Sequence, residues 1–205
     1  MKEINKFFTT IFFVLFVIVT KAESKILSIG SPDAKVTVKV FSSLTCPHCA
    51  NFHNEIFNNL KEDFIDKGLV RFEHHPFPLD LAALNAEIIL GCKDNSSMQP
   101  KNPQTQKNFK LLSEMYAKQK AWAIGSDINK INDLIKKIGL NFDLSDKEMD
   151  ICLKNEKIQD KILEQRIEAQ KIYKIESTPT IFVNEKKYTN KVDYKTFKKI
   201  IEKNL

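Results

Sequence analysis

Two cysteines separated by two residues are the side chains of this sequence best placed for chemistry. They occur in Cys46-Pro47-His48-Cys49, directly after a short apolar run. Apolar residues then recur at the i, i+3 or i+4 spacing of a buried helical stripe, which predicts a helix from residue 47 to about residue 66. Cysteines at this spacing can close a small disulfide ring, although two cysteines alone could also be half of a zinc site.

The start of the helix should make the two sulfurs chemically different. Proline suits the first helical turn, where its missing N–H costs nothing, so Pro47 places Cys46 at the N-cap. There Cys46 faces unpaired N–H groups and the positive end of the helix dipole, which favour a thiolate, and we expect His48 to lower its pKa further. Cys49, one turn in, should be a buried, ordinary thiol. Cys46 is therefore the sulfur that attacks or is attacked, and Cys49 resolves the mixed disulfide.

Strands on both sides of that helix would hold it in place. Residues 36–41 alternate as a strand does, and residues 69–75 form a second strand after Gly68 ends the helix, so we expect a right-handed βαβ unit. Much later, Thr178-Pro179-Thr180 precedes an apolar strand at residues 180–183. Because proline cannot donate to a sheet ladder, we expect a cis Thr178–Pro179 bond there rather than a trans proline in an ordinary turn.

At these motifs the sequence resembles the DsbA-type thiol:disulfide oxidoreductases of the thioredoxin superfamily, and more closely their smaller, alphaproteobacterial-like members. The resemblance covers nearly all of the chain after about residue 30. It rests on four stretches, Val36-Thr37-Val38, Cys46-Pro47-His48-Cys49, Pro76-Phe77-Pro78-Leu79 and Ser177-Thr178-Pro179-Thr180. It implies an α/β, thioredoxin-like fold with a central mixed β-sheet and a large α-helical insertion.

The resemblance also implies an activity and its participants. The protein would donate a Cys46–Cys49 disulfide to folding exported proteins through a mixed disulfide, with Pro47 and His48 completing the catalytic motif. The loop at Thr178 and Pro179 would pack against the cysteines and bind a peptide like an added strand. A quinone-linked membrane partner would re-oxidise the protein, and no metal or organic cofactor is expected.

Two other functions remain open at this point. A disulfide reductase or isomerase of the same fold would use the same cysteines with a different membrane donor, although a histidine between the cysteines favours the oxidase. A non-catalytic metal-binding or chaperone-like protein would instead hold copper or zinc with Cys46, Cys49 and His48.

The first twenty-two residues have the pattern of a secretory signal peptide. Lys2 and Lys6 precede an apolar run at residues 7–19, and a small residue, Ala22, ends the segment. An uncleaved anchor is the alternative, but about thirteen apolar residues fall short of the roughly twenty that span a bilayer. We expect cleavage, a periplasmic location and no stable membrane insertion afterwards. Cleavage removes three lysines and one glutamate, which lowers the net charge from +6 to +4, and the spread of lysines predicts no nucleic-acid site.

Cys92 and Cys152 form the natural second pair in a compartment where disulfides persist. A structural disulfide between them would close a loop of about sixty residues and could stabilise the fold by ~4 kcal/mol on the chain-entropy model. Two buried free thiols are the alternative, and family members with cysteines at similar places support the bond.

The predicted domain organisation follows from these motifs. After the signal peptide at residues 1–22, residues 23–79 and 157–205 should form the two parts of the thioredoxin-like domain, and residues 80–156 the helical insertion. Within and after it we expect a helix at 80–92, an exposed loop at 94–108, and helices at 109–123, 127–138 (stopped by Gly139), 145–152, 157–173 and 193–203.

The remaining histidines predict no metal site. Adjacent residues on a strand face opposite sides, so His74 and His75 should be a structural or surface pair. We expect His53, one turn past Cys49, to face solvent.

Overall fold

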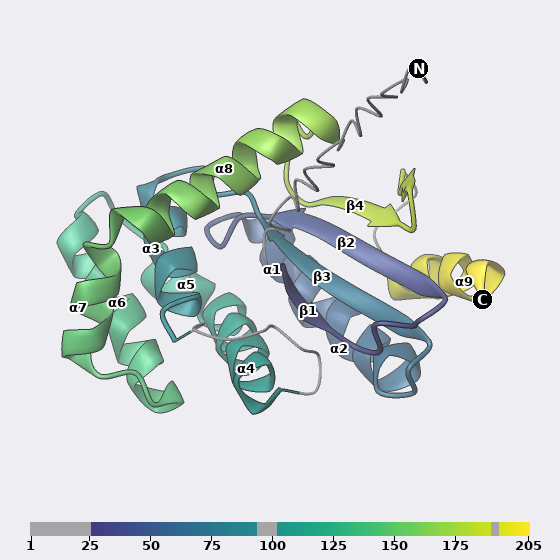
Figure 1. Cartoon of the computed structure of the whole chain (residues 1–205), viewed down its shortest axis with the longest axis horizontal. Coiled ribbons are helices and arrows are strands. Elements are labelled where there is room, and N and C mark those ends of the chain that lie inside the picture. The colour runs from purple at the N-terminus through teal and green to yellow at the C-terminus, as the bar shows by residue number, and fades with distance from the viewer. Residues whose placement is uncertain (1–25, 94–101, 190–192) are drawn as a thin grey trace, which may run out of the picture.

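The computed structural model describes residues 26–93, 102–189 and 193–205, and five strands among them form one mixed sheet in the order β1-β3-β2-β4-β5 (Figure 1). Their bounds are Leu27–Ile29 for β1, Val36–Ser42 for β2, Val70–Pro76 for β3, Thr180–Val183 for β4 and Lys186–Lys187 for β5. The central strands β2 and β3 run parallel, and every other neighbouring pair is antiparallel. The expected mixed sheet is therefore confirmed.

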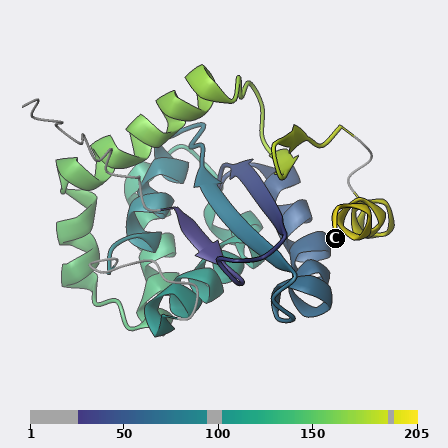
Figure 2. The same cartoon turned by 45° about the vertical axis from the view of Figure 1, so that its right-hand side comes forward.

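Helices gather on two sides of this sheet. The helical segments are α1 Pro47–Phe52, η1 His53–Phe57, α2 Asn58–Leu60, η2 Lys61–Ile65, α3 Leu81–Leu90, α4 Pro103–Ala117, α5 Gln119–Trp122, α6 Ile128–Gly139, η3 Leu140–Phe142, α7 Asp146–Leu153, α8 Glu156–Ile172 and α9 Tyr194–Asn204. In two views α3, α6 and α7 lie together on one side, α9 lies on the other, and α8 leads from the first group toward β4 (Figure 1, Figure 2). Within the described residues, no helix has both the length and the apolar character needed to cross a membrane.

The helical stretch after the two cysteines follows the predicted apolar stripe. The residues along that stripe are buried: Cys49, Phe52, Ile56, Leu60 and Phe64. Two π-helical turns, η1 and η2, interrupt regular α-helix, which the sequence did not predict. Gly68 ends the stretch in a left-handed conformation at φ +73°, as expected.

The loop predicted at residues 94–108 is wrong in its second half. Residues 94–101 lie outside the described part, but α4 begins at Pro103, where proline again occupies the first turn and the Asn102 side chain accepts a hydrogen bond from the Gln104 N–H. Thr105 and Asn108 are buried. The single helix predicted at 109–123 is instead the end of α4 followed by the separate short helix α5.

The α-helix α6 ends at Gly139, close to the predicted end, and the 3-10 turn η3 follows it. Gly139 itself keeps helical angles at φ −57°, and the left-handed residue comes later, at Asp143 with φ +60°. A Cβ atom on Gly139 would lie 2.5 Å from Met149 Sδ, so a larger residue here would require the flexible Met149 side chain to move. At the start of α7, Ser145 and Glu148 form a capping box, in which each side chain bonds the backbone N–H of the other.

Pairing of β4 with β2 decides where the late proline lies. The register places Thr180 opposite Phe41, near the end of β2 that leads into the cysteine motif. The peptide bond between Thr178 and Pro179 is cis, as expected, and Thr180 Oγ1 donates a hydrogen bond to the Ser177 carbonyl oxygen at 2.7 Å. Two segments more than 130 residues apart thus meet at one end of the sheet.

Candidate active site

The cysteine motif starts where β2 ends. Cys46 is the N-cap of α1, with extended angles (φ −77°, ψ 120°), and its side chain makes no capping bond; Pro47 occupies the first turn. The Cys46 backbone oxygen accepts hydrogen bonds from the N–H groups of Cys49 and Ala50, both at 3.1 Å. Cys46 and Cys49 are unbonded thiols here, 7 % and 2 % exposed. The sulfur of Cys46 is therefore free to receive hydrogen bonds at the helix start.

Hydrogen bonding to Cys46 makes it a strong acid among thiols. The hydrogen bond from the Cys49 side chain lowers the pKa of Cys46 to about 5, against the opposing effect of burial. The Thr178 side chain and the backbone N–H groups of Cys49 and His48 lower the pKa further. Burial, and then the neighbouring Cys46, raise the pKa of Cys49 well above its ordinary value. The site thus holds one thiolate and one thiol at neutral pH.

His48 acts on this sulfur through its backbone. Its side chain and that of Pro47 are exposed, and the N–H of His48 is the group that lowers the pKa of Cys46.

Thr178 and Pro179 lie beside the cysteines. When protonated, Cys46 Sγ donates a hydrogen bond to the Thr178 carbonyl oxygen at 3.4 Å. Both residues also line a groove of about 420 Å³, whose other walls come from the start of the helical stretch: His48, Asn51, Phe52, Glu55 and Ile56. An extended segment of another chain could lie in this groove next to the Cys46 sulfur.

Two polar residues that support the loop before Cys46 were missed by sequence analysis. The Gln119 side-chain amide, buried on α5, donates hydrogen bonds to the Leu44 and Cys46 carbonyl oxygens at 2.8 and 2.9 Å. Thr45 Oγ1 donates to Asp80 Oδ2 at 2.8 Å. Asp80 is the N-cap of α3, a helix that the sequence predicts, so its position was open to sequence reasoning. No sequence pattern connects Gln119 with Cys46, because the two are 73 positions apart.

The prediction that His53 faces solvent is wrong. Its ring is 3 % exposed, stacks against Phe57 and Tyr116, and its Nε2 lies 2.8 Å from Ser113 Oγ. The packing of α4 against the helical stretch, which no local pattern encodes, covers this residue. Burial, and then the charge of His74, lower the pKa of His53 to about 3.

His74 and His75 do face opposite sides of β3, as expected. His74 is buried and lies 3.0 Å from a Glu87 carboxylate oxygen, whereas His75 lies 3.0 Å from Glu73 and packs its ring on Phe41. Across the residues that the structure describes, no group of three or more His, Cys, Asp and Glu side chains is arranged to hold a metal ion.

Cys92 and Cys152 are joined in a disulfide with a Cα–Cα distance of 5.6 Å. The bond links the residues just after α3 to α7, and α3 also packs on α6 and α8. It therefore ties together the helices that lie beside the sheet rather than the cysteine motif itself.

A cysteine pair at the start of a helix, facing the cis-proline loop that leads into β4, defines a thioredoxin-like protein with a thiol-disulfide site. The family model described as thioredoxin matches residues 21–203. Disulfide bond formation protein D of Bacillus subtilis is 32% identical over 187 residues, covering 86% of this chain and 76% of that protein. The chain therefore belongs to the thioredoxin family, among its DsbA-like proteins.

Two further comparisons give the same picture. A provisionally named protein-disulfide oxidoreductase of Rickettsia bellii is 28% identical over 170 residues; these cover 82% of this chain but only 61% of that longer protein. The crystal structure of alpha-DsbA1 from Wolbachia pipientis superposes with a TM-score of 0.75 at 25% identity, covering 87% of this chain and 89% of the other. The fold extends over nearly the whole chain.

Proposed function

We propose that this protein is an enzyme that catalyses thiol–disulfide exchange and donates a Cys46–Cys49 disulfide to other proteins. The observation that carries the proposal is the difference between the two sulfurs: the pKa of Cys46 is lowered to about 5 while Cys49 is kept as a buried thiol. A stabilised thiolate is a good leaving group and stabilises the reduced form, so the disulfide should be oxidising. The names of the Bacillus and Rickettsia relatives support the same activity.

The exchange proceeds in two displacements. A substrate thiolate attacks the Cys46 sulfur, forms a mixed disulfide and releases Cys49, whose sulfur takes up a proton. A second substrate thiolate then attacks the substrate sulfur of the mixed disulfide and displaces Cys46 as a thiolate, which the hydrogen bonds at the helix start stabilise. The substrate ends with a new disulfide, and the enzyme ends as a dithiol.

Substrate would bind in the groove beside Cys46. The Thr178 backbone, fixed by the cis-Pro179 bond, would pair with an extended peptide, with Pro47 and His48 at the exposed rim. Phe52 and Ile56 supply an apolar floor.

The cellular setting is part of the same proposal. Residues 1–22, which lie outside the described part of the chain, would be a cleaved signal peptide that directs export to the periplasm. Clients would be exported proteins with cysteines, and a quinone-linked membrane protein would restore the disulfide. Residues 80–156 would be a helical insertion between the two parts of the domain at 23–79 and 157–205, braced by the Cys92–Cys152 bond.

A reductase or isomerase remains the second candidate, because it would need the same fold and the same cysteines. The low pKa of Cys46 favours the oxidase.

The equilibrium of the Cys46–Cys49 pair with glutathione tests the proposal. Mature protein is equilibrated in buffers of defined glutathione ratio, quenched with acid and alkylated, and the mass shift gives the reduced fraction. We expect the pair to stay reduced except in strongly oxidising buffers, and a Cys46→Ser variant to lose all exchange. A pair that stays oxidised until the buffer is strongly reducing would exclude the oxidase and leave the reductase as the better assignment.

A further inference from the structure

The groove beside Cys46 is lined by one carboxylate and no side chain of opposite charge. On its helical side the lining residues recur at the spacing that brings side chains to one face of a helix, and they are His48, Asn51, Phe52, Glu55 and Ile56. Thr178 and Pro179 form the opposite wall. None of these residues is a lysine or an arginine, so with His48 neutral the Glu55 carboxylate alone sets the charge of the groove.

The Glu55 side chain is exposed and available to another molecule. Its backbone oxygen accepts a hydrogen bond from the Asn59 side-chain amide at 2.9 Å, but within the described part of the chain no hydrogen bond or ion pair engages its carboxylate. Phe52 and Ile56, 3 % and 2 % exposed, form an apolar floor beside it. A carboxylate at the edge of such a floor can accept hydrogen bonds from a cationic side chain of a bound segment.

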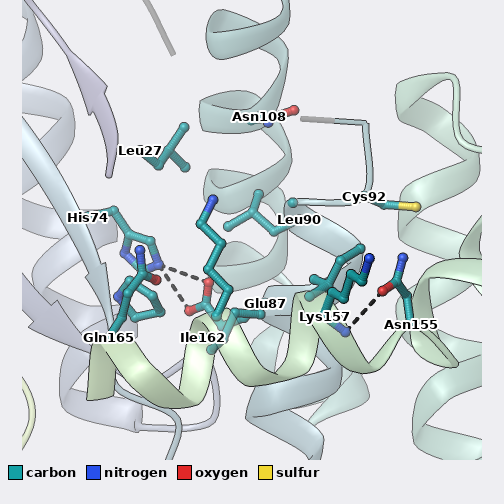
Figure 3. A pocket seen from close by; sticks show the side chains of 14 residues that line it. Leu27, His74, Glu87, Leu90, Cys92, Asn108, Asn155, Lys157, Ile162 and Gln165 are labelled. Atoms are coloured by element: carbon teal, nitrogen blue, oxygen red, sulfur yellow. Dashed lines mark hydrogen bonds and ion pairs between the residues drawn. The ribbon is translucent and has the colours of Figure 1, made fainter. Parts of the chain in front are cut away.

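Two other carboxylates that border the active-site loop or a cavity are already occupied. Asp80 accepts a hydrogen bond from the Thr45 hydroxyl and caps the start of α3. Glu87 lines a separate cavity of about 250 Å³ beside α8, where Figure 3 shows its carboxylate bonded to His74. Glu55 differs from both because its carboxylate is left for a partner outside this chain.

The helical stretch fixes how far Glu55 lies from the reacting end of the groove. Glu55 comes seven positions after His48. A helix rises by about 1.5 Å per residue, so the two are separated by roughly 10 Å along the groove. An extended segment advances by about 3.3 Å per residue and covers that length with roughly three residues. The residue that meets Glu55 is therefore about three positions from the client cysteine.

We propose that Glu55 is a specificity-determining residue that selects client segments carrying an arginine or a lysine about three residues from the exchanging cysteine. The inference rests on the proposed function, because a client must lie in this groove to reach Cys46. The apolar stem of the basic side chain lies on the floor of Phe52 and Ile56, and its charged end reaches the Glu55 carboxylate. A glutamate at the same client position is repelled. The net positive charge of the whole chain would by itself favour acidic clients, which is the opposite preference.

Rates of mixed-disulfide formation with charged peptides test the inference. Each probe peptide has one cysteine, activated as a disulfide with thiopyridine, and arginine, glutamine or glutamate three residues before it. A second set places these residues three positions after the cysteine. The Cys46 thiolate of the reduced mature protein attacks the peptide sulfur, the new S–S bond forms, and thiopyridine leaves with the electron pair of the old bond and takes up a proton. The initial rate of thiopyridone release follows this single step, which an oxidase and a reductase share.

In one of the two sets we expect the arginine peptide to react about threefold faster than the glutamine peptide, and the glutamate peptide about threefold slower, as for an exposed ion pair and an equal repulsion. Glu55→Gln should bring the three rates to within about 1.5-fold of one another, and Glu55→Lys should reverse their order. These ratios compare peptides on the same protein, so they cancel any change in the reactivity of Cys46. Salt at about 1 M, where the Debye length is about 3 Å, should remove most of the preference.

Glu62→Gln is the matched control. Glu62 is an exposed glutamate on the same helical stretch that does not line the groove, so this variant should keep the full preference for the arginine peptide. Equal rates for the arginine and glutamate peptides in both sets, a faster reaction of the glutamate peptide, or a preference that survives Glu55→Gln would each overturn the inference.

The outcome is separate from the test of the proposed function. A Cys46–Cys49 pair that proves reducing in the glutathione equilibrium, with the arginine preference intact, would exclude the oxidase and leave the role of Glu55 standing. An oxidising pair on a protein without the preference would exclude the role of Glu55 and leave the oxidase standing.

Discussion

The hydrogen bond between the two cysteines is the main cause of the low pKa of Cys46, and it can be removed alone. Cys49→Ala deletes the donor, whereas Cys49→Ser keeps a donor of similar size at the same place. Because Cys92 and Cys152 are bonded to each other, Cys46 is then the one cysteine that titrates. The pair of variants separates the side-chain hydrogen bond from the backbone N–H groups and Thr178.

The size of the effect follows from the pKa. At about 5, the thiolate-to-thiol ratio at pH 7 is about 100 to 1, whereas the ordinary value of 9.0 would give about 1 to 100. One hydrogen bond to an anion changes such a ratio by roughly a factor of ten. In Cys49→Ala we therefore expect the thiolate fraction at pH 5 to fall from about a half to roughly a tenth, and in Cys49→Ser to fall less.

The ultraviolet absorbance of the thiolate measures the thiolate fraction of Cys46. It is recorded on each variant from acid to alkaline pH. The iodoacetamide reaction rate over the same range gives an independent readout, because only the thiolate reacts. Equal titration curves for Cys49→Ala and Cys49→Ser would refute the hydrogen bond as the main cause.

The same shift predicts a pH dependence of stability for the reduced protein. The folded pKa of Cys46 lies below its unfolded value of 9.0, so the unfolded chain holds the proton more tightly between the two values. The contribution is therefore fully present above about 9, declines as pH falls, and is absent below about 5.

Three further outcomes are expected. The double variant Cys92→Ala/Cys152→Ala, which opens a loop with a sequence separation of 60, should lose up to ~4 kcal/mol of unfolding free energy in urea titrations while the thiolate titration of the site stays unchanged. Gln119→Ala leaves two backbone carbonyls of the active-site loop unpaired and should cost about 1–3 kcal/mol in the same assay, whereas the exposed Gln170→Ala should cost almost nothing. His53, with a pKa lowered to about 3 by burial, should show no imidazole titration by NMR between pH 7 and 4, and the stability it contributes above pH 6.5 should be lost as pH falls toward 3.

Local patterns were sufficient for most of the elements near the site. The period of the apolar residues after Cys49 predicted one helical stripe, and Pro47 at its first turn placed Cys46 at the N-cap, because these features depend on backbone geometry within one or two turns. The same logic failed at Pro103, where a first-turn proline was taken for a loop. At Gly139 it placed the end of α6 correctly, but the glycine keeps helical angles and is not a left-handed cap.

Residue patterns alone were enough to find the two cysteines, their different positions on one helix, and the strand, helix and proline motifs that identify a thioredoxin-like fold. The family resemblance led us to expect Thr178, 132 positions from Cys46, beside the cysteines, whereas the contact of Gln119, 73 positions away, became visible in the folded structure. The tertiary structure also buried His53 and joined His74 to Glu87. The reason is physical: periodicity is set by neighbouring backbone torsions, whereas hydrogen bonds and burial between distant segments arise when whole elements pack, which residue spacing does not encode.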